Sequence, residues 1–338
     1  MDKKDEIILQ QLDVIRSMTE NGLRRMNTDF WGNPQPKKEM PKKEEVKKAE
    51  AEVEAEKPAE EELPPPEKLE DLLAELDTYI GLDVIKEEVR SLINMVQIYK
   101  LRREHDLPTT DMSLHMVFSG NPGTGKTMMA RMMARIYRTL GILSKGQLVE
   151  VDRSGLVAGY VGQTALKTAK VLEKAMGGVL FIDEAYALNS ESENDFGQEA
   201  IDTILKAMED PRDDLVVIVA GYTELMDKFV HSNPGLESRF NRFMFFPDYT
   251  VEEMMAIFKM RCGKGYTLAE DAEPLVRDYI AEESADAESF GNARGVRNIL
   301  EHIIVAQNNR LAKMENITRE DLMLLTADDV LQARGKID

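Results

Sequence analysis

Several features are scarce in this 338-residue sequence, and each scarcity excludes a class of protein. Cys262 is the only cysteine, which excludes an intrachain disulfide and a cysteine-cluster metal site, so we expect a buried thiol without a chemical role. No apolar run approaches the roughly 20 residues that cross a bilayer. The charged start, MDKKDEIILQQ, is unlike a signal peptide. We therefore expect a cytoplasmic protein with no membrane partner.

An excess of positive charge is also lacking. The chain has 43 Lys and Arg residues against 62 Asp and Glu residues, which gives a formal charge of -19. Such a surface repels a phosphate backbone. No nucleic-acid partner is expected.

The first part of the chain has little that can build a core. Within residues 1–32, apolar residues recur at steps of four, three and three, which predicts one amphipathic helix that docks on its own assembly or on a partner. These residues are Ile8, Leu12, Ile15 and Met18. Residues 33–68 contain seven of the 13 prolines among Lys, Glu and Ala, which predicts a flexible charged linker.

From Leu69 onward, short apolar runs alternate with helical patterns. Continuous apolar strands of this kind are typical of a parallel sheet covered on both faces. The expected strands are 114–119, 147–151, 178–182, 215–220 and 243–246. The sequence thus predicts an α/β domain over residues 69–247.

Beyond Pro247 the strand patterns stop. Thr250 with Glu253 forms a capping-box signature, and Thr318 with Asp321 forms a weaker one. We predict a small all-α domain over residues 248–338. Its expected helices are about 250–262, 272–284, 293–314 and 319–333.

The segment GNPGTGKT, residues 120–127, fits the P-loop pattern and lies between a predicted strand and a predicted helix. Its glycines let backbone N–H groups surround phosphate oxygens, Lys126 reaches the β- and γ-phosphates of ATP, and Thr127 offers a hydroxyl to Mg²⁺. An ordinary glycine-rich turn would not require the Lys-Thr pair. The residues expected to contact the nucleotide are Asn121, Pro122, Gly123, Thr124, Gly125, Lys126, Thr127 and Met128.

The segment VLFIDEA, residues 179–185, is an apolar strand that ends in two carboxylates, as in a Walker B motif. Asp183 is expected to hold Mg²⁺, and Glu184 to act as the general base for the attacking water. Such a strand end taken alone is more often a solvated edge. The P-loop favours the functional interpretation.

From about Tyr79 to Leu311 the chain resembles the CbxX/CfqX branch of the AAA+ ATPases, which includes red-type Rubisco activases and resembles stage V sporulation protein K. The resemblance rests on these ordered blocks: IGLDVIKEEV, HMVFSGNPGTGKT, VEVDRSGLVAGYVGQTALKT, GGVLFIDEAYAL, FGQEAIDTILKAMED, DDLVVIVAGY, SNPGLESRF and FGNARGVRN. It implies a five-stranded AAA+ sheet, a helical lid, and a homo-oligomeric ring of six subunits with ATP at each interface.

The resemblance also implies where the adenine ring and the adjacent subunit act. Ile80, Gly81 and Leu82 would lie against adenine, although a core or turn role is equally compatible with the sequence. Arg239 aligns with the arginine finger that reaches the γ-phosphate of the neighbouring subunit. The alternatives are Arg242 nearby, or a surface salt bridge for either arginine.

Two nucleotide sensors follow from the same resemblance. Arg294 aligns with the sensor-2 arginine of the lid, and Arg297, one helical turn further on, is the alternative. Sensor 1 stays open, since the residues at that corner, 220–223, are Ala, Gly, Tyr and Thr.

The segment GYVG, residues 159–162, matches the central-pore loop with which AAA+ rings grip extended polypeptide. Tyr160 offers a large face that binds without specific hydrogen bonds, Val161 adds a branched apolar side chain, and the flanking glycines permit movement. An exposed turn with one tyrosine is the simpler alternative.

The main hypothesis is an ATP-dependent motor that remodels or partially threads a protein substrate, with Rubisco activase-like chaperone activity as one form of it. A nucleic-acid-acting AAA+ ATPase and a nucleotide-gated scaffold, with sporulation or secretion duties, are the alternatives. The complete set of ATPase motifs argues against an inactive scaffold. The identity of the substrate does not follow from the sequence.

Overall fold

The computed structural model describes residues 65–109, 113–160, 162–189, 196–209, 214–263 and 265–335. All of them belong to one compact unit that spans residues 63–338. The predicted amphipathic helix and nearly all of the predicted linker lie outside the described residues.

The α/β part contains one five-stranded sheet in the order β2-β3-β4-β1-β5, and every neighbouring pair is parallel. The strands are β1 (Met116–Ser119), β2 (Leu148–Val151), β3 (Gly178–Ile182), β4 (Leu215–Gly221) and β5 (Arg242–Phe245). All five predicted strands are confirmed, with ends that differ by at most two residues. The fold class predicted from the sequence is therefore correct.

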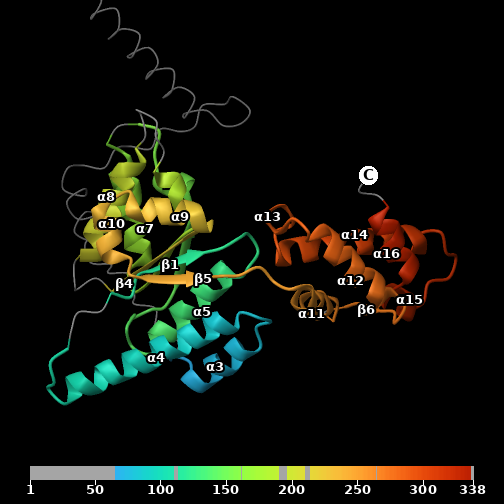
Figure 1. The fold of residues 1–338 in the computed structure, drawn as a ribbon, viewed down its shortest axis with the longest axis horizontal. Coiled ribbons are helices and arrows are strands. Elements are labelled where there is room, and N and C mark those ends of the chain that lie inside the picture. The colour runs from blue at the N-terminus through green and yellow to red at the C-terminus, as the bar shows by residue number, and fades with distance from the viewer. Residues whose placement is uncertain are drawn as a thin grey trace, which may run out of the picture. The chain divides into compact units, whose positions relative to one another are not determined.

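Both faces of the sheet are covered by helices (Figure 1). Met116 and Phe118 belong to a core with α3, α4 and α5, whereas Val117 between them belongs to a second core with helices from α6 to α10. Side chains alternate between the faces of a strand, so a strand buried on both faces reads as a continuous apolar run. The helices are α3 (Leu69–Asp77), α4 (Asp83–Glu104), α5 (Lys126–Thr139), α6 (Arg153–Leu156), α7 (Thr164–Ala175), α8 (Gly197–Glu209), α9 (Thr223–His231) and α10 (Pro234–Arg239), with the 3-10 helix η1 (Ala185–Leu188) after β3.

The residues after Phe246 form a helical lid. The two predicted capping boxes, Thr250 with Glu253 and Thr318 with Asp321, are confirmed by hydrogen bonds in both directions. Cys262 is buried as expected, and burial raises the pKa of its thiol to about 11. The lid helices are α11 (Val251–Cys262), α12 (Ala272–Glu283), α13 (Ala287–Phe290), α14 (Ala293–Leu311), α15 (Arg319–Met323) and α16 (Ala327–Arg334).

The prediction that strands stop beyond Pro247, and that one helix spans 319–333, is wrong. The lid contains a short parallel pair, β6 (Thr267–Leu268) with β7 (Leu324–Leu325), and β7 separates α15 from α16. The buried Gln307 side chain donates to the backbone carbonyls of Asp321, Leu322 and Leu324, which satisfies carbonyls at the end of α15 and so helps to end that helix before Leu324. Thr326 then starts α16 with a third capping box.

None of the helices in the described ranges is both long and apolar enough to span a membrane.

Candidate active site

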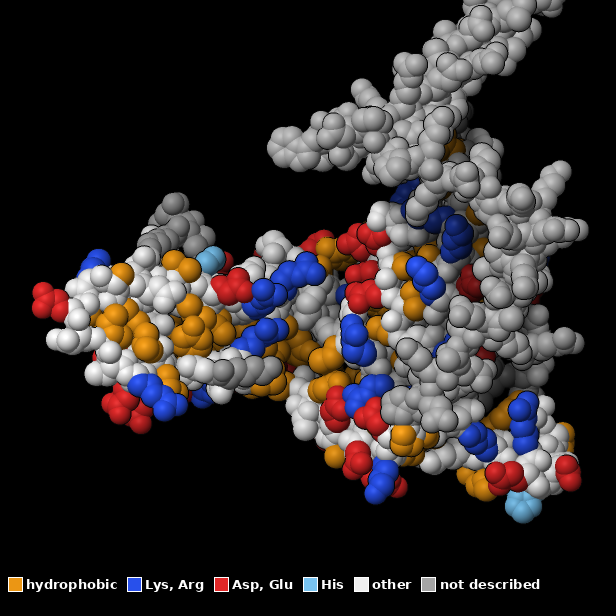
Figure 2. Space-filling view, turned by 180° about the vertical axis from the view of Figure 1, so that it is seen from behind, with side chains coloured by type: hydrophobic (Ala, Val, Ile, Leu, Met, Phe, Trp, Pro, Cys, Tyr) orange, Lys and Arg blue, Asp and Glu red, His pale blue; other side chains and the backbone are white. Residues whose placement is uncertain are grey.

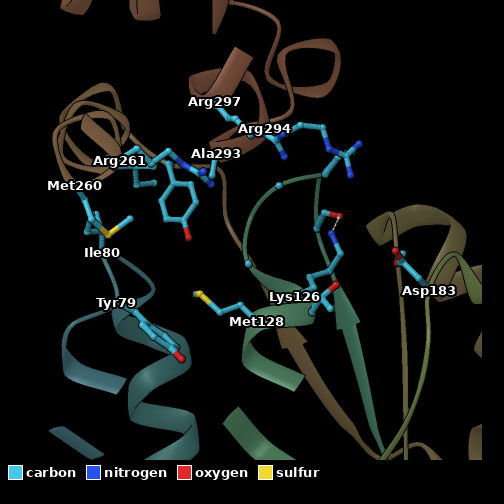
Figure 3. A pocket seen from close by; sticks show the side chains of 18 of the residues that line it. Tyr79, Ile80, Lys126, Met128, Asp183, Met260, Arg261, Ala293, Arg294 and Arg297 are labelled. Carbon is cyan, nitrogen blue, oxygen red and sulfur yellow. Dashed lines mark hydrogen bonds between the residues drawn. The ribbon is translucent and has the colours of Figure 1, made fainter. Parts of the chain in front are cut away.

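A cavity of about 620 Å³ opens at the carboxyl ends of the sheet strands and is closed on one side by the lid. This volume lies within the range of about 300–1,000 Å³ that is usual for small-molecule sites. Figure 3 shows Lys126 and Asp183 toward one end of the cavity and Tyr79, Ile80 and Met260 toward the other. We call these the phosphate end and the base end.

The P-loop, residues 120–127, forms the wall of the phosphate end. Gly120, Gly123 and Gly125 have φ values of +143°, +73° and +97°, a region that favours glycine. A Cβ at Gly120 would collide with the carbonyl oxygen of Phe246, and one at Gly123 with that of Gly291. Helix α5 follows at once, and no side chain among the described residues caps its first turn. Its free N–H groups and the tight backbone fit a phosphate group.

Lys126 crosses this loop from the first turn of α5. Its Nζ donates to the carbonyl oxygens of Gly120 at 2.7 Å and Asn121 at 2.8 Å. Burial lowers the pKa of its ammonium group; Asp183 partly opposes this change, whereas Arg294 adds to it. A desolvated cation beside backbone N–H groups is suited to bind a polyanion.

Asp183 and Glu184 reach the cavity directly after β3. The Asp183 backbone N–H donates to the carbonyl of Val151 at 2.9 Å, and its side chain accepts from the Glu184 N–H at 3.1 Å. Glu184 has a φ of +49°, an uncommon conformation for a residue with a side chain. The strand end therefore turns sharply where the chemistry is expected.

Thr127 and Asp183 both line the cavity and offer oxygen atoms suited to Mg²⁺. The described residues contain no group of three or more His, Cys, Asp or Glu residues that would form a metal cage. Mg²⁺ is commonly bound by one or two protein groups together with substrate phosphates and water. The donor set fits that mode.

The lid supplies the opposite wall, mainly with arginines from α11 and α14. Arg261, Arg294 and Arg297 all line the cavity (Figure 3). Arg297 donates to Glu301 at 2.7 Å, one helical turn further on. Among the described residues, the side chain of Arg294 has no hydrogen-bond or ion-pair partner, and the buried Nε of Arg261 has no hydrogen-bond partner. The lid thus presents guanidinium groups whose donors are still available.

The IGL segment is divided between the cavity and the core. Ile80 lines the base end, whereas Gly81 and Leu82 do not line it. Leu82 is buried and precedes α4 with a φ of +59°. A Cβ at Gly81 would collide with the Glu253 carboxylate of α11. Only one of the three predicted adenine contacts is therefore placed at the cavity.

Two of the predicted P-loop contacts also face elsewhere. Thr124 is buried, and its hydroxyl donates to the carbonyl of Asn121 at 2.8 Å. The Asn121 side chain donates to Asp248. Pro122, Gly123, Gly125, Lys126, Thr127 and Met128 line the cavity.

At the sensor-1 corner, Gly221 and Tyr222 line the cavity at the end of β4. The rings of Tyr222 and Tyr186 lie 6.3 Å apart. Burial, followed by the nearby Glu184, raises the pKa of Tyr186 to about 12. Thr223, the last residue of this corner, begins α9 and does not line the cavity.

Arg239 and Arg242 do not line the cavity of their own chain. Arg239 donates to the Gly235 carbonyl at 2.8 Å and forms an ion pair with Glu209. Arg242 donates to the Ser113 carbonyl at 3.1 Å. Within one chain, Arg239 therefore forms the salt bridge that was the alternative to its role as an arginine finger.

Tyr160 lies in the segment between α6 and α7 and is 74% exposed. A Cβ at Gly159 or Gly162 would meet nothing within 4 Å, but Gly162 has a φ of +76°, a region that favours glycine. Val161 lies outside the described residues.

Several cavity residues did not follow from the sequence because no local motif marks them. Tyr79 and Tyr249 line the base end, and burial raises the pKa of each phenol to about 12, so both stay neutral. Ile257, Met260 and Arg261 come from α11, which the sequence predicted only as a helix. The position of Tyr79 next to Ile80 was the one available signal.

A P-loop at the carboxyl edge of this five-stranded sheet, closed by a helical lid, defines an ATPase of the AAA class. The model of the "ATPase family associated with various cellular activities (AAA)" matches residues 116–248, and that of the "AAA lid domain" matches residues 250–337. The chain is 44% identical to ribulose bisphosphate carboxylase/oxygenase activase of Cyanidioschyzon merolae, over 79% of this chain and 92% of the relative. It is also 44% identical to protein CbxX of Cupriavidus necator, over 78% and 84%. The chain therefore belongs to the CbxX/CfqX family of AAA+ ATPases, and membership implies nucleotide binding and ATP hydrolysis.

Two further comparisons agree with this family and fold. Stage V sporulation protein K of Bacillus subtilis is 40% identical over 78% of this chain and 82% of its own length. The crystal structure of the FIGL-1 AAA domain superimposes with a TM-score of 0.55 at 18% identity, covering 84% of this chain and 92% of that one. The latter similarity concerns the fold alone.

Proposed function

We propose that this ATPase is a motor that works as a homo-oligomeric ring, most simply of six subunits, and remodels a protein substrate by drawing part of it into a central pore. The observation that carries the proposal is the 74% exposure of Tyr160, in the segment between α6 and α7. We further propose domain limits of 69–247 for the ATPase domain and 248–338 for the lid.

At the phosphate end, the P-loop N–H groups and Lys126 bind the β- and γ-phosphates of ATP. Thr127 and Asp183 hold Mg²⁺, which when bound offsets the negative charge of the phosphates. Glu184 accepts a proton from the attacking water. Arg294 donates to the γ-phosphate, and its lack of a partner among the described residues supports this role over Arg297, which pairs with Glu301.

The proposed ring places Arg239 against the cavity of the adjacent subunit. Its position away from its own cavity supports a role in trans, and the role requires Arg239 to exchange Glu209 for phosphate oxygens. The lid has surface suited to such contacts, because hydrophobic side chains gather on one of its faces (Figure 2). The exposed hydrophobic residues of the lid include Val305, Met314, Ile317, Leu322 and Leu331.

Hydrogen bonds from α7 hold the residues that precede Tyr160 in place. Thr164 is buried, and its hydroxyl accepts from the Ala158 N–H at 3.0 Å. Lys167 donates to the carbonyls of Ser154 at 2.6 Å and Val157 at 2.9 Å. Because these hydrogen bonds connect the segment to α6 and α7, movement of the two helices would move the exposed Tyr160 ring, which could then pull on a bound polypeptide.

The test is the ratio of substrate-stimulated to basal ATP hydrolysis by the full chain. Inhibited ribulose bisphosphate carboxylase/oxygenase is the first probe, because one relative is named as its activase, and unfolded casein is the second. We expect stimulation by at least one probe, a loss of that stimulation in Tyr160→Ala, and retention in Tyr160→Phe. Ile98→Ala, an exposed apolar change on α4 away from the lid surface and from the segment that carries Tyr160, is the control. Full stimulation of Tyr160→Ala would contradict the motor, and stimulation by DNA alone would favour a nucleic-acid-acting ATPase.

A further inference from the structure

Asn292 stands immediately before α14, two residues ahead of Arg294. It is fully buried, and its φ of +52° is combined with a ψ of -123°. The left-handed conformation that asparagine tolerates has a ψ of about +47°, so this backbone lies outside it. Glycine would occupy such a conformation with little strain. Because asparagine is strained here and glycine would not be, we infer that the hydrogen bonds of the Asn292 side chain offset the strain of its backbone.

The Asn292 amide contacts two segments that are distant in the sequence. Its Oδ1 accepts from the Tyr249 N–H at 2.9 Å. Its Nδ2 donates to Oδ1 of Asp248 at 2.8 Å and to the carbonyl of Pro122 at 3.3 Å. Asp248 and Tyr249 belong to residues 247–250, the hinge segment between β5 and α11, and Pro122 belongs to the P-loop.

Two further hydrogen-bonded contacts join the P-loop to the hinge segment and to the start of α14. Asn121 of the P-loop donates to both carboxylate oxygens of Asp248, at 3.0 and 2.9 Å. The Ala293 N–H, at the start of α14, donates to the Gly123 carbonyl at 3.3 Å. Three segments thus meet at one buried amide: the phosphate-binding loop, the hinge segment and the start of the helix that carries Arg294.

We propose that Asn292, together with Asp248, is a positioning residue that fixes the start of α14 to the backbone of the P-loop, so that Arg294 is held over the phosphate end of the cavity. The inference rests on the proposed contact of Arg294 with the γ-phosphate. Asn292 itself does not contact the nucleotide.

Asn292→Gly is the decisive variant, because it removes the three side-chain hydrogen bonds and relieves the backbone strain. Asn298→Gly is the control: Asn298 is exposed inside the same helix, where glycine is unfavourable, so this variant weakens α14 without removing the buried contacts. The measured quantity is the ratio of ATP to ADP affinity, from titration of the full chain with each nucleotide. A general loosening of the lid would weaken both nucleotides alike.

We expect Arg294→Ala to lower the preference for ATP over ADP about tenfold, since a charge-assisted contact to the γ-phosphate is lost. Asn292→Gly should lower it severalfold, and Asn298→Gly should leave it unchanged. In the double variant with Arg294→Ala, Asn292→Gly should add little, because its effect passes through Arg294. Asp248→Asn, which keeps the shape of the side chain but weakens the acceptor, should lie between Asn292→Gly and the original chain.

The results separate two kinds of failure. If Asn292→Gly behaves like Asn298→Gly, or if its effect adds in full to that of Arg294→Ala, the positioning role is wrong while the proposed function stands. If Arg294→Ala itself leaves the preference for ATP unchanged, the proposed γ-phosphate contact is wrong. If the original chain binds neither nucleotide, the proposed function is wrong.

Discussion

The two walls of the cavity are built in different ways. The P-loop wall consists of consecutive residues, and its backbone provides the binding groups, which the glycines at 120, 123 and 125 make possible. The lid wall consists of single side chains from α11 and α14, and its guanidinium groups contact the cavity only because the lid packs against the P-loop. The first wall is thus determined locally, and the second by tertiary packing.

The walls also differ in how their polar groups are satisfied. Lys126 of the P-loop already donates to two carbonyls of its own loop, and Asp183, which faces the same end of the cavity from the end of β3, accepts a backbone N–H. Arg294, in contrast, has no such partner among the described residues of the chain. We infer that the P-loop wall is prepared before the nucleotide binds, whereas the lid wall gains contacts from it. Substitutions in the P-loop wall should therefore lower ATP hydrolysis more than substitutions in the lid wall.

The largest effect is expected on the P-loop wall. Lys126→Met keeps much of the side-chain volume but removes a desolvated cation beside the phosphates. We expect ATP hydrolysis to fall by about 10²–10³, the usual effect of removing one donor from an electrostatic site. A steady-state phosphate-release assay measures it. Hydrolysis within tenfold of the original rate would place phosphate binding on the lid wall instead.

The next effect tests the lid wall with two arginines on one helix. Arg294→Ala should lower hydrolysis by about tenfold or more, because a charge-assisted contact is lost. Arg297→Ala should lower it less than about threefold, since a surface ion pair such as that with Glu301 contributes little. The two variants are compared in the same assay. The reverse order would assign the sensor role to Arg297.

A smaller effect is expected at the base end, where Ile80 lines the cavity and Leu82 lies in the core. Ile80→Ala should weaken ATP binding about fivefold without a large change in stability, because apolar contact with the base is lost. Leu82→Ala should lower the free energy of unfolding by about 2–5 kcal/mol, as expected for a buried leucine. Nucleotide titration and thermal unfolding distinguish them. Equal effects of both variants on binding would show that the IGL segment acts as a unit.

The smallest effect on hydrolysis is expected far from both walls, at Asp329 in the lid. Burial raises the pKa of this carboxyl, but hydrogen bonds from Arg310 and Thr326 outweigh burial and leave the pKa below its ordinary 3.8. The charged form therefore stabilises the lid above about pH 4, and this contribution is lost as the pH falls through the lowered value. Asp329→Asn should change hydrolysis at 25 °C less than about twofold.

Asp329→Asn should nevertheless lower the free energy of unfolding by about 3 kcal/mol near pH 7, because Arg310 loses its buried partner. Thermal unfolding at pH 7 and pH 3 measures the change. The difference from the original chain should shrink at the lower pH. A constant difference would mean that the packing of Asp329, and not its charge, stabilises the lid.

The sequence predicted the parts of the molecule whose causes are local. The P-loop, the Walker B strand end and all five strands of the main sheet depend on short motifs and on continuous apolar runs. The break between α15 and α16 was missed because it depends on the Gln307 amide, which lies 14 to 17 residues before the carbonyls it contacts. The Thr326 capping box was a local signal that could have revealed it.

Other parts of the site depend on tertiary contacts and were not predictable. Arg261 and Tyr249 line the cavity because α11 folds back over it, which no periodicity reveals. The choice between Arg294 and Arg297 had a local signal, since Glu301 lies one helical turn after Arg297. The roles of Arg239 and Tyr160 involve other chains, so a single chain cannot determine them.

The central claim is that this cavity binds ATP and hydrolyses it with Glu184 as the base. The most direct measurement compares Glu184→Gln with the original full chain in two assays, equilibrium binding of ATP with Mg²⁺ and steady-state hydrolysis. We predict that the variant retains ATP binding while hydrolysis falls by about 10² or more. Hydrolysis by Glu184→Gln at the original rate would contradict the account.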